Sequence, residues 1–270
     1  NLFFHFAGIT LLGVSGVIDS NTTWTKANSP YVVTGNVGIP EGIRLTIEPG
    51  VEVRFEGAYE ILVNGSVDAN GTTSEPIVFS STTLGTSSGA TMLFFKKADL
   101  NETTLNHVSF LDASRAIRVG NTDTDNNTGN LRGSNLFFNR ASILTDGADS
   151  GSRVIIRNSE VNATTIKGNY PRSEVIEIHD SNLSNTTLVS DSYHNGFIIT
   201  NSNFDNIQAT MGCCGANFRM ENIRGEDFTV REGDGSPVSG EFYIENSIIE
   251  RFSLVLNSAK VTVRNSILTQ

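Results

Sequence analysis

Cysteine, proline and regular helical patterns are scarce in this chain of 270 residues. Its 2 Cys are too few for a disulfide framework, and its 6 Pro leave long stretches uninterrupted. No stretch of three turns or more gathers its apolar residues on one helical face. Basic residues number 19 against 29 acidic ones, giving a net charge of −10. Because an acidic surface repels phosphate groups, binding to nucleic acid or anionic membranes is not expected.

Small polar residues and apolar residues together dominate what is present. Hydrophobic residues make up 38% of the chain, which is enough for one large buried core. Asn, Ser, Thr and Gly are abundant, and Ser, Thr and Asn compete with the helical backbone for hydrogen bonds. The composition therefore favours an all-β domain with many turns.

A short motif recurs through the C-terminal half: alternating apolar residues, then Asn-Ser, then one residue and an apolar one. Copies read VIIRNSEV at residues 154–161, VIEIHDSNL at 175–183, FIITNSNF at 197–204, FYIENSII at 242–249 and KVTVRNSIL at 260–268, with weaker copies at 218 and upstream. A period near 22 residues with alternation inside each unit predicts a solenoid whose coils supply short strands to parallel sheets.

The turn position of this repeat predicts a structural ladder. Asn and Asp tolerate a positive φ at a corner between strands, and stacked Asn side chains can hydrogen-bond from coil to coil. In the weaker upstream copies the alignment puts His107 and Gly133 at this position. The predicted ladder residues are Asn158, Asp180, Asn201, Asn222, Asn246 and Asn265.

The N-terminal half carries a second pattern of short strands separated by turns. Strands are expected at residues 31–34, 43–47, 51–55 and 60–63, between Pro-Glu-Gly, Pro-Gly and Asn-Gly turns. The segments LTIEPGVEVRF, ILVNGSVDANGT and EPIVFSS, after the Trp24 and Ser29-Pro30-Tyr31 entry, resemble secreted right-handed parallel β-helix proteins of bacteria and archaea, in the pectate-lyase-like superfamily. The resemblance implies one right-handed β-helix domain over residues 20–270, behind an apolar segment at residues 1–19.

The outward-facing column of residues next to the ladder is the place where a β-helix enzyme would carry its catalytic groups. It reads Arg157, His179, Thr200, Glu221, Glu245 and Arg264. This mixture has no paired carboxylates of the kind that glycosidases use, so no enzyme activity is expected. A solvated face is the expected reading, and a carbohydrate-binding groove is the alternative. The interior column is expected to be buried: Ile156, Ile178, Ile199, Met220, Ile244 and Val263.

No cofactor is expected. The acidic loop at residues 121–130 places Asp123, Asp125 and Asn127 like the start of a Ca²⁺ loop. Gly129 is one position late, however, and no Glu occupies the twelfth position. A solvated loop is therefore expected there. The four His residues are not at metal-ligand spacing with one another or with Cys.

Two features concern covalent chemistry. Cys213 and Cys214 are adjacent, which leaves a strained vicinal disulfide, free thiols or a bond to another chain as alternatives. Glycosylation sequons, of the form Asn-x-Ser/Thr, are frequent enough to arise by chance in this composition, so they carry weight only with the secreted resemblance. The candidates are Asn21, Asn64, Asn70, Asn101, Asn126, Asn162, Asn182 and Asn185.

The two ends of the chain suggest an assembly. The last residues lie in the middle of a repeat, and the first residues are unusually apolar, as in the remnant of a signal or anchor segment. They could pack as a donor strand on a neighbouring copy or cap their own domain. We expect an extracellular or cell-surface structural protein that assembles into a filament, a pilus-like fibre or a surface layer. A carbohydrate-binding adhesin and a polysaccharide lyase or hydrolase are the alternatives, and no membrane-spanning segment is expected. The candidate assembly residues are Leu2, Phe3, Phe4, Phe6, Ile9, Leu11 and Leu12.

Overall fold

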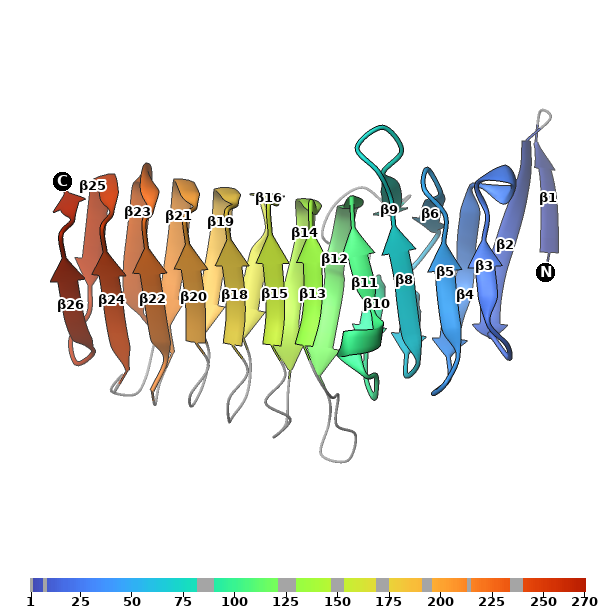
Figure 1. Ribbon diagram of the computed structural model, residues 1–270, viewed down its shortest axis with the longest axis horizontal. Coiled ribbons are helices and arrows are strands. Elements are labelled where there is room, and N and C mark those ends of the chain that lie inside the picture. The colour runs from blue at the N-terminus through green and yellow to red at the C-terminus, as the bar shows by residue number, and fades with distance from the viewer. Residues whose placement is uncertain are drawn as a thin grey trace.

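The chain forms one long solenoid. The computed structural model describes residues 2–6, 9–81, 90–120, 130–146, 153–168, 175–190, 196–212, 215–233 and 240–270; for 2–6, 9–11 and 146 only the backbone is described. In Figure 1 the front strands run upward, the back strands run downward and the chain advances from right to left. That combination is a right-handed coil, so the predicted right-handed parallel β-helix is confirmed.

Sheet B faces the viewer in Figure 1 and contains one strand from each successive coil. All of its pairings in the described chain are parallel. Its strands are β3 (Thr22–Trp24), β5 (Arg44–Ile47), β8 (Ser66–Asn70), β11 (Thr104–Asn106), β13 (Asn130–Ser134), β15 (Arg153–Arg157), β18 (Val175–His179), β20 (Gly196–Thr200), β22 (Asn217–Glu221), β24 (Glu241–Glu245) and β26 (Lys260–Arg264).

Sheet A forms the other walls of the solenoid. Its pairings are parallel apart from the first, in which β1 runs antiparallel to β2. Two short 3₁₀ helices, η1 (Lys26–Asn28) and η3 (Leu100–Glu102), lie in connections. The strands of sheet A are β1 (Leu2–Phe6), β2 (Ile9–Val17), β4 (Tyr31–Ile39), β6 (Glu52–Phe55), β7 (Glu60–Val63), β9 (Ile77–Ser81), β10 (Thr91–Phe95), β12 (Val108–Gly120), β14 (Phe137–Asp146), β16 (Glu160–Asn162), β17 (Thr165–Gly168), β19 (Asn182–Ser190), β21 (Asn203–Met211), β23 (Arg224–Glu232), β25 (Ile248–Val255) and β27 (Ile267–Leu268).

The corner between the two sheets is built at the predicted ladder position. All six predicted residues have a positive φ, between 44° and 55°. The Asn201 amide donates to Asp180 Oδ1 at 3.2 Å, and the Asn222 amide donates to Asn201 Oδ1 at 2.9 Å. In the weaker copies His107 also has a positive φ, but Gly133 is wrong: it lies within β13, and the corner residue is Asn135.

The Ser that follows the corner residue has its own role. Turning the chain at the corner points one backbone N–H into the interior, where it needs an acceptor. Ser181 Oγ accepts from Ser159 N at 3.1 Å and donates to the carbonyl of His179 at 2.7 Å. The same exchange links Ser202 to Ser181 N and Ser266 to Ser247 N. The Asn-Ser motif thus supplies both the left-handed corner and a hydroxyl for the N–H that it buries.

A second left-handed corner, which the sequence did not suggest, bends sheet A. Its residues all have φ between 47° and 56° and are stacked one per coil: Asp112, Arg140, Ala163, Asn185, Asn206, Asp227 and Arg251. Residue type varies at this corner because different side-chain bonds support it. Asn206 donates to Asn185 at 2.9 Å, whereas Arg251 forms an ion pair with Asp227 at 2.6 Å.

The core consists of apolar side chains stacked along the solenoid axis. Phe110 stacks on Phe79 and Phe138 with ring centroids 5.3 and 5.1 Å apart, close to the spacing of adjacent strands. The predicted interior column is buried at its first five positions. The sixth, Val263, is 46% exposed because it lies on β26, the edge strand of sheet B in the described chain.

The N-terminal segment joins its own domain. Residues of β2 pair in parallel with β4, with Leu12 opposite Tyr31, and among the described strands β1 pairs only with β2. This arrangement follows the alternative in which the segment begins its own solenoid. The side chains of Leu2, Phe3, Phe4, Phe6, Ile9 and Leu11 lie outside the described residues, while Leu12 packs against the core.

Replacing Ser181 by Ala tests the role of the corner hydroxyl. The change leaves Ser159 N–H buried without an acceptor, so the free energy of unfolding should fall by about 1–3 kcal/mol. Ser253→Ala is the matched control, because Ser253 is exposed on β25. Urea unfolding followed by circular dichroism measures both. Equal stability of the two variants would contradict the assigned role.

Candidate functional site

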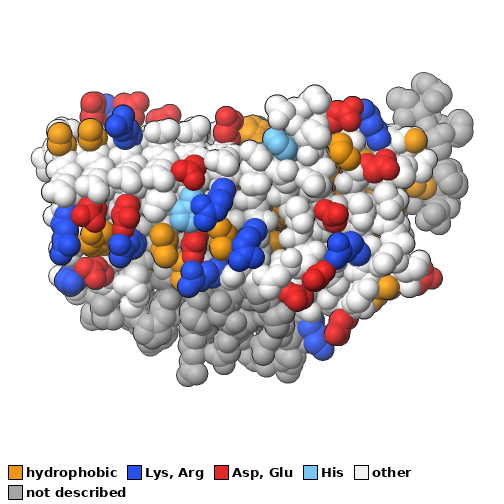
Figure 2. Space-filling model, viewed as in Figure 1, with side chains coloured by type: hydrophobic (Ala, Val, Ile, Leu, Met, Phe, Trp, Pro, Cys, Tyr) orange, Lys and Arg blue, Asp and Glu red, His pale blue; other side chains and the backbone are white. Residues whose placement is uncertain are grey.

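The outer face of sheet B carries the largest mixed array of functional groups that we find in the described chain. Alternate residues of each strand point outward, and parallel pairing stacks them into columns. The column beside the ladder is confirmed in register as Arg157, His179, Thr200, Glu221, Glu245 and Arg264. Figure 2 shows basic and acidic side chains interspersed over the middle and left of this face.

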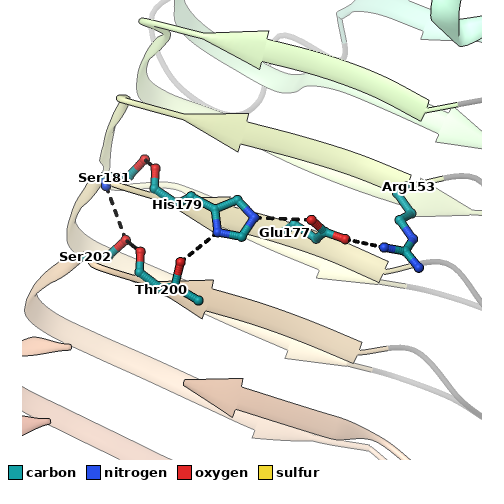
Figure 3. Close-up of polar contacts among 6 residues, drawn as sticks. All are labelled: Arg153, Glu177, His179, Ser181, Thr200 and Ser202. Carbon is teal, nitrogen blue, oxygen red and sulfur yellow. Dashed lines mark hydrogen bonds and ion pairs between the residues drawn. The ribbon is translucent and has the colours of Figure 1, made fainter. Parts of the chain in front are cut away.

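A polar network lies at the centre of this face, on β15, β18 and β20 (Figure 3). Arg153 forms an ion pair with Glu177 Oε1 at 2.7 Å, and His179 Nε2 lies 3.2 Å from Glu177 Oε2. The other ring nitrogen of His179 lies 2.7 Å from Thr200 Oγ1. Four side chains from three successive coils are therefore held in one connected arrangement.

The environment of Glu177 keeps its carboxylate charged. Only 9% of the residue is exposed, and burial alone would raise the pKa of its carboxyl. Hydrogen bonds from His179 and Arg153, together with their charges, outweigh burial and lower the pKa of Glu177 below its ordinary value. A carboxylate in this state is a fixed negative charge and a hydrogen-bond acceptor, not a proton donor at neutral pH.

A groove of about 380 Å³ lies next to this network, toward the N-terminal end of sheet B. It is bordered by η3 and floored by β11, β13 and β15. Arg132 and Arg157 line it, and Arg132 also donates to Asn101 Oδ1 at 3.2 Å. Ile155 lies between the two arginines on the same face. The groove thus combines two guanidinium groups and amide groups with apolar contacts from Ile155, Leu100 and Leu105.

An aromatic side chain lies on the other side of the network. Arg219 stacks over the Tyr243 ring at 5.0 Å and Arg264 at 5.9 Å, both from the guanidinium carbon to the ring centroid. The Tyr243 hydroxyl donates to Glu245, and Arg219 donates to Glu221 at 2.7 Å. Arg219 and Tyr243 each pair with a carboxylate on their own strand, and the contacts between the guanidinium groups and the ring join neighbouring coils.

Sequence reasoning found one column of this face and missed its neighbour. Glu177, Tyr243 and Arg219 lie two residues before the ladder-side column on the same strands. The alternation that predicted the first column also predicts the second, so the signal was present. The alternation does not predict which residues pair, because Arg153 lies opposite Val175 and reaches Glu177 diagonally on the neighbouring strand.

Several predicted residues are not part of this face or are not described. Cys213, Cys214, Asp123, Asp125, Asn126 and Asn127 lie outside the described residues. The remaining sequons are spread over both sheets and the connections, and Asn162 and Asn185 belong to the second corner. Within the described ranges, no three His, Cys, Asp or Glu side chains are grouped to hold a metal ion. No helix in the same ranges has the length and apolar character to span a bilayer.

Comparison with known proteins agrees with the fold. Residues 16–136 match the family model of the pectate-lyase like beta helix domain. With the right-handed solenoid, this match supports the pectate-lyase-like superfamily. The chain is a β-helix protein. It is also similar to Protein bark beetle of Drosophila melanogaster, with 36% identity over 66 residues, which cover 24% of this chain and 2% of the fly protein. The secreted bacterial or archaeal source stays a prediction.

Replacing Glu177 by Gln tests the network through its pH dependence. A carboxyl with a lowered pKa contributes stability above its ordinary pKa, near 4.5, and loses it as the pH falls through the folded-state value. The wild type should exceed Glu177→Gln in stability by about 1–2 kcal/mol at pH 7, and the difference should shrink below pH 4.5.

Urea titrations at pH 7 and pH 3 measure the difference. Glu160→Gln, which removes one exposed negative charge from β16, controls for the change in net charge. If the free energies of unfolding of wild type and Glu177→Gln differed equally at both pH values, the stabilising role of the ionised Glu177 would be contradicted.

Proposed function

We propose that this chain is an extracellular structural β-helix subunit that stacks head to tail on copies of itself. The final coil carries the proposal, because its interior positions face solvent. Val261 is level with Phe242 and Val263 with Ile244, and both of those partners are fully buried. Yet Val261 is 41% and Val263 46% exposed. An apolar slice of core of this kind is stabilised by a further coil stacked on it.

The opposite end offers a surface that fits this slice. A groove of about 350 Å³ lies among β2, β3 and β4, and Leu12, Val14, Trp24, Tyr31 and Val37 supply its apolar lining. Trp24 and Tyr31 stack there with ring centroids 4.8 Å apart. Polar side chains, among them Ser15, Asp19 and Asn28, line the rest of the groove. The projecting valines at one end and the apolar part of this groove at the other are the two surfaces that we propose to meet.

The sheet edges support the same arrangement. In the described chain sheet B ends in β3 on one side and β26 on the other, each with one unpaired edge. Adding β3 of one copy to β26 of the next would continue sheet B across the contact by strand addition. Such a contact joins two different surfaces and does not close on itself, so it generates a fibre.

Electron microscopy of purified protein tests the proposal with a matched pair of variants. We expect fibres from the wild type and short rods from Val261→Arg/Val263→Arg, because two charges would be buried at the contact. Thr262→Arg lies between them but points to the outer face, so its fibres should persist. Rods alone from the wild type, or fibres from the double variant, would refute head-to-tail stacking.

Truncation provides a further test of the groove end. Removing residues 1–16 deletes β1 and most of β2, including Leu12 and Val14 of the groove lining. We expect this truncated chain to stay folded from β4 onward and to lose its fibres. Circular dichroism checks the fold. Fibres of undiminished length from the folded truncated chain would mean that the groove end does not form the contact.

A second candidate function, glycan binding, is favoured by the groove on sheet B. Arg132 and Arg157 line it, and Arg153 lies on the same strand as Arg157. Guanidinium and amide groups hydrogen-bond sugar hydroxyl and acidic groups readily. Binding on a glycan array that is lost in Arg132→Ala/Arg157→Ala would support it, with Arg219→Ala as the control on the same sheet.

We further propose that the chain is not an enzyme. General acid catalysis of glycoside cleavage needs a carboxyl with a raised pKa, paired with a second carboxylate. At the centre of sheet B the buried carboxyl is Glu177, whose pKa is lowered by His179 and Arg153. Its direct partners are the basic side chains of Arg153 and His179. Because this carboxylate is ionised and both of its oxygens are bonded, we propose that it holds Arg153 and His179 in place and does not transfer protons.

A further inference from the structure

Two sequon side chains use both ends of their amide inside the fold. Asn162 donates from Nδ2 to Asn139 at 3.2 Å, while its Oδ1 accepts from Ser184 at 3.0 Å and from Asn185 at 3.2 Å. Asn185 in turn accepts on Oδ1 from Asn206 at 2.9 Å. The amide nitrogens of Asn162 and Asn185 therefore point along the solenoid toward the preceding coil.

The hydroxyl of the Asn162 sequon is also engaged. Thr164, its third residue, donates to the carbonyl of Asn162 at 2.8 Å and is buried. An engaged hydroxyl does not by itself separate the sequons, because Thr103 of the Asn101 sequon accepts from Val67 N–H and Ser184 of the Asn182 sequon donates to Asn162. What distinguishes Asn162 is that its amide nitrogen is also in use. Its polar groups serve to hold the second corner together.

Four other sequon side chains are exposed, as Asn185 also is, but their described hydrogen bonds engage only the oxygen. Asn21 Oδ1 accepts from the backbone N–H of Arg44 at 2.9 Å, and Asn101 Oδ1 accepts from Asn130 N at 3.2 Å. A backbone N–H can only donate, so the atom facing it must be the oxygen, and the amide nitrogen is turned outward.

The other two exposed sequons show the same pattern with a side-chain donor. Asn70 accepts on Oδ1 from Asn106 at 3.0 Å, and Asn182 accepts from Asn203 at 2.8 Å. In all four, the oxygen is fixed against a neighbouring coil and the nitrogen remains available at the surface. The described contacts thus divide the sequons into two classes by the atom that the fold uses.

We propose that Asn21, Asn70, Asn101 and Asn182 are N-glycan acceptors and that Asn162 and Asn185 are not. The proposal rests on the extracellular location proposed above. In the reaction Nδ2 forms a bond to the anomeric carbon of a sugar donor with a diphosphate leaving group. The carbon–oxygen bond to the diphosphate breaks, the diphosphate leaves with the electron pair, and Nδ2 loses one proton. On an outward nitrogen the sugar projects into solvent, whereas at Asn162 or Asn185 it meets the next side chain of the ladder.

The assignment leaves a continuous part of the molecule uncovered. Residues 186–270 contain nine Asn and none begins a sequon; in four of them Ser directly follows Asn. Glycans on the four acceptors would therefore be attached no later in the chain than β19, away from the last described coil, β26 and β27. Asn64 is left unassigned, since it is half-buried and its Oδ1 has no partner within the described chain.

Secretion of the full chain from insect cells, followed by site-resolved mass spectrometry, tests the division. We expect N-acetylhexosamine on Asn21, Asn70, Asn101 and Asn182 and unmodified Asn162 and Asn185 in the folded fraction. Sugar on Asn162 or Asn185, or no sugar on any of the four acceptors, would overturn the proposal. Fibre formation is scored separately on the same samples, so failure of the stacking proposal is distinguishable.

Unglycosylated protein from bacteria gives an independent readout. Asn162→Ala removes three ladder hydrogen bonds, whereas the matched Asn182→Ala removes one at an exposed position. We expect a clear drop in the unfolding temperature for Asn162→Ala and little change for Asn182→Ala. Equal loss in both would show that the ladder does not distinguish the two classes.

Discussion

The fold depends on how the backbone N–H and C=O groups find hydrogen-bond partners at the left-handed corners. A solenoid needs its chain to turn sharply in every coil, and each turn interrupts the regular exchange of hydrogen bonds between parallel strands. Asn158 and its equivalents accept the positive φ, and their own N–H groups still bond to the next coil, as Asn158 N does to the His179 carbonyl at 3.2 Å. The inward N–H of the following residue is met by a Ser hydroxyl. Core packing and the outer faces follow from corners that repeat in register.

The second corner shows that the left-handed conformation does not require one residue type. Arg is costly at positive φ, because its Cβ crowds the backbone, yet Arg140 and Arg251 occupy this conformation. Each forms an ion pair with an Asp one coil earlier, Asp112 for Arg140 and Asp227 for Arg251. The hydrogen bond from Arg251 also lowers the pKa of Asp227. Complementary pairs along the column replace the Asn–Asn bond where the sequence departs from Asn.

These two corners explain how far the sequence allowed prediction. The first repeats Asn-Ser and was found, with one error at Gly133, because in that coil Ser134 precedes Asn135 instead of following it. The second has no residue consensus, so its regularity exists only in backbone dihedrals. On sheet B the outward columns followed from alternation, but the pairing of Arg153 with Glu177 depends on rotamers and on the offset between coils. Val263 was misjudged because burial in a solenoid depends on the neighbouring coil as well as on the residue.

The two kinds of side-chain bond that satisfy the backbone point in opposite directions along the axis. A Ser hydroxyl accepts the N–H of the coil before it, as Ser181 does for Ser159. An Asn at a strand start instead accepts the N–H of the coil after it, as Asn21 does for Arg44 and Asn130 for Arg153. An internal coil linked in both ways is complete only when both neighbours are present. Unfolding of one internal coil therefore removes hydrogen bonds from the coils on both of its sides. This coupling between neighbouring coils makes unfolding of the solenoid cooperative.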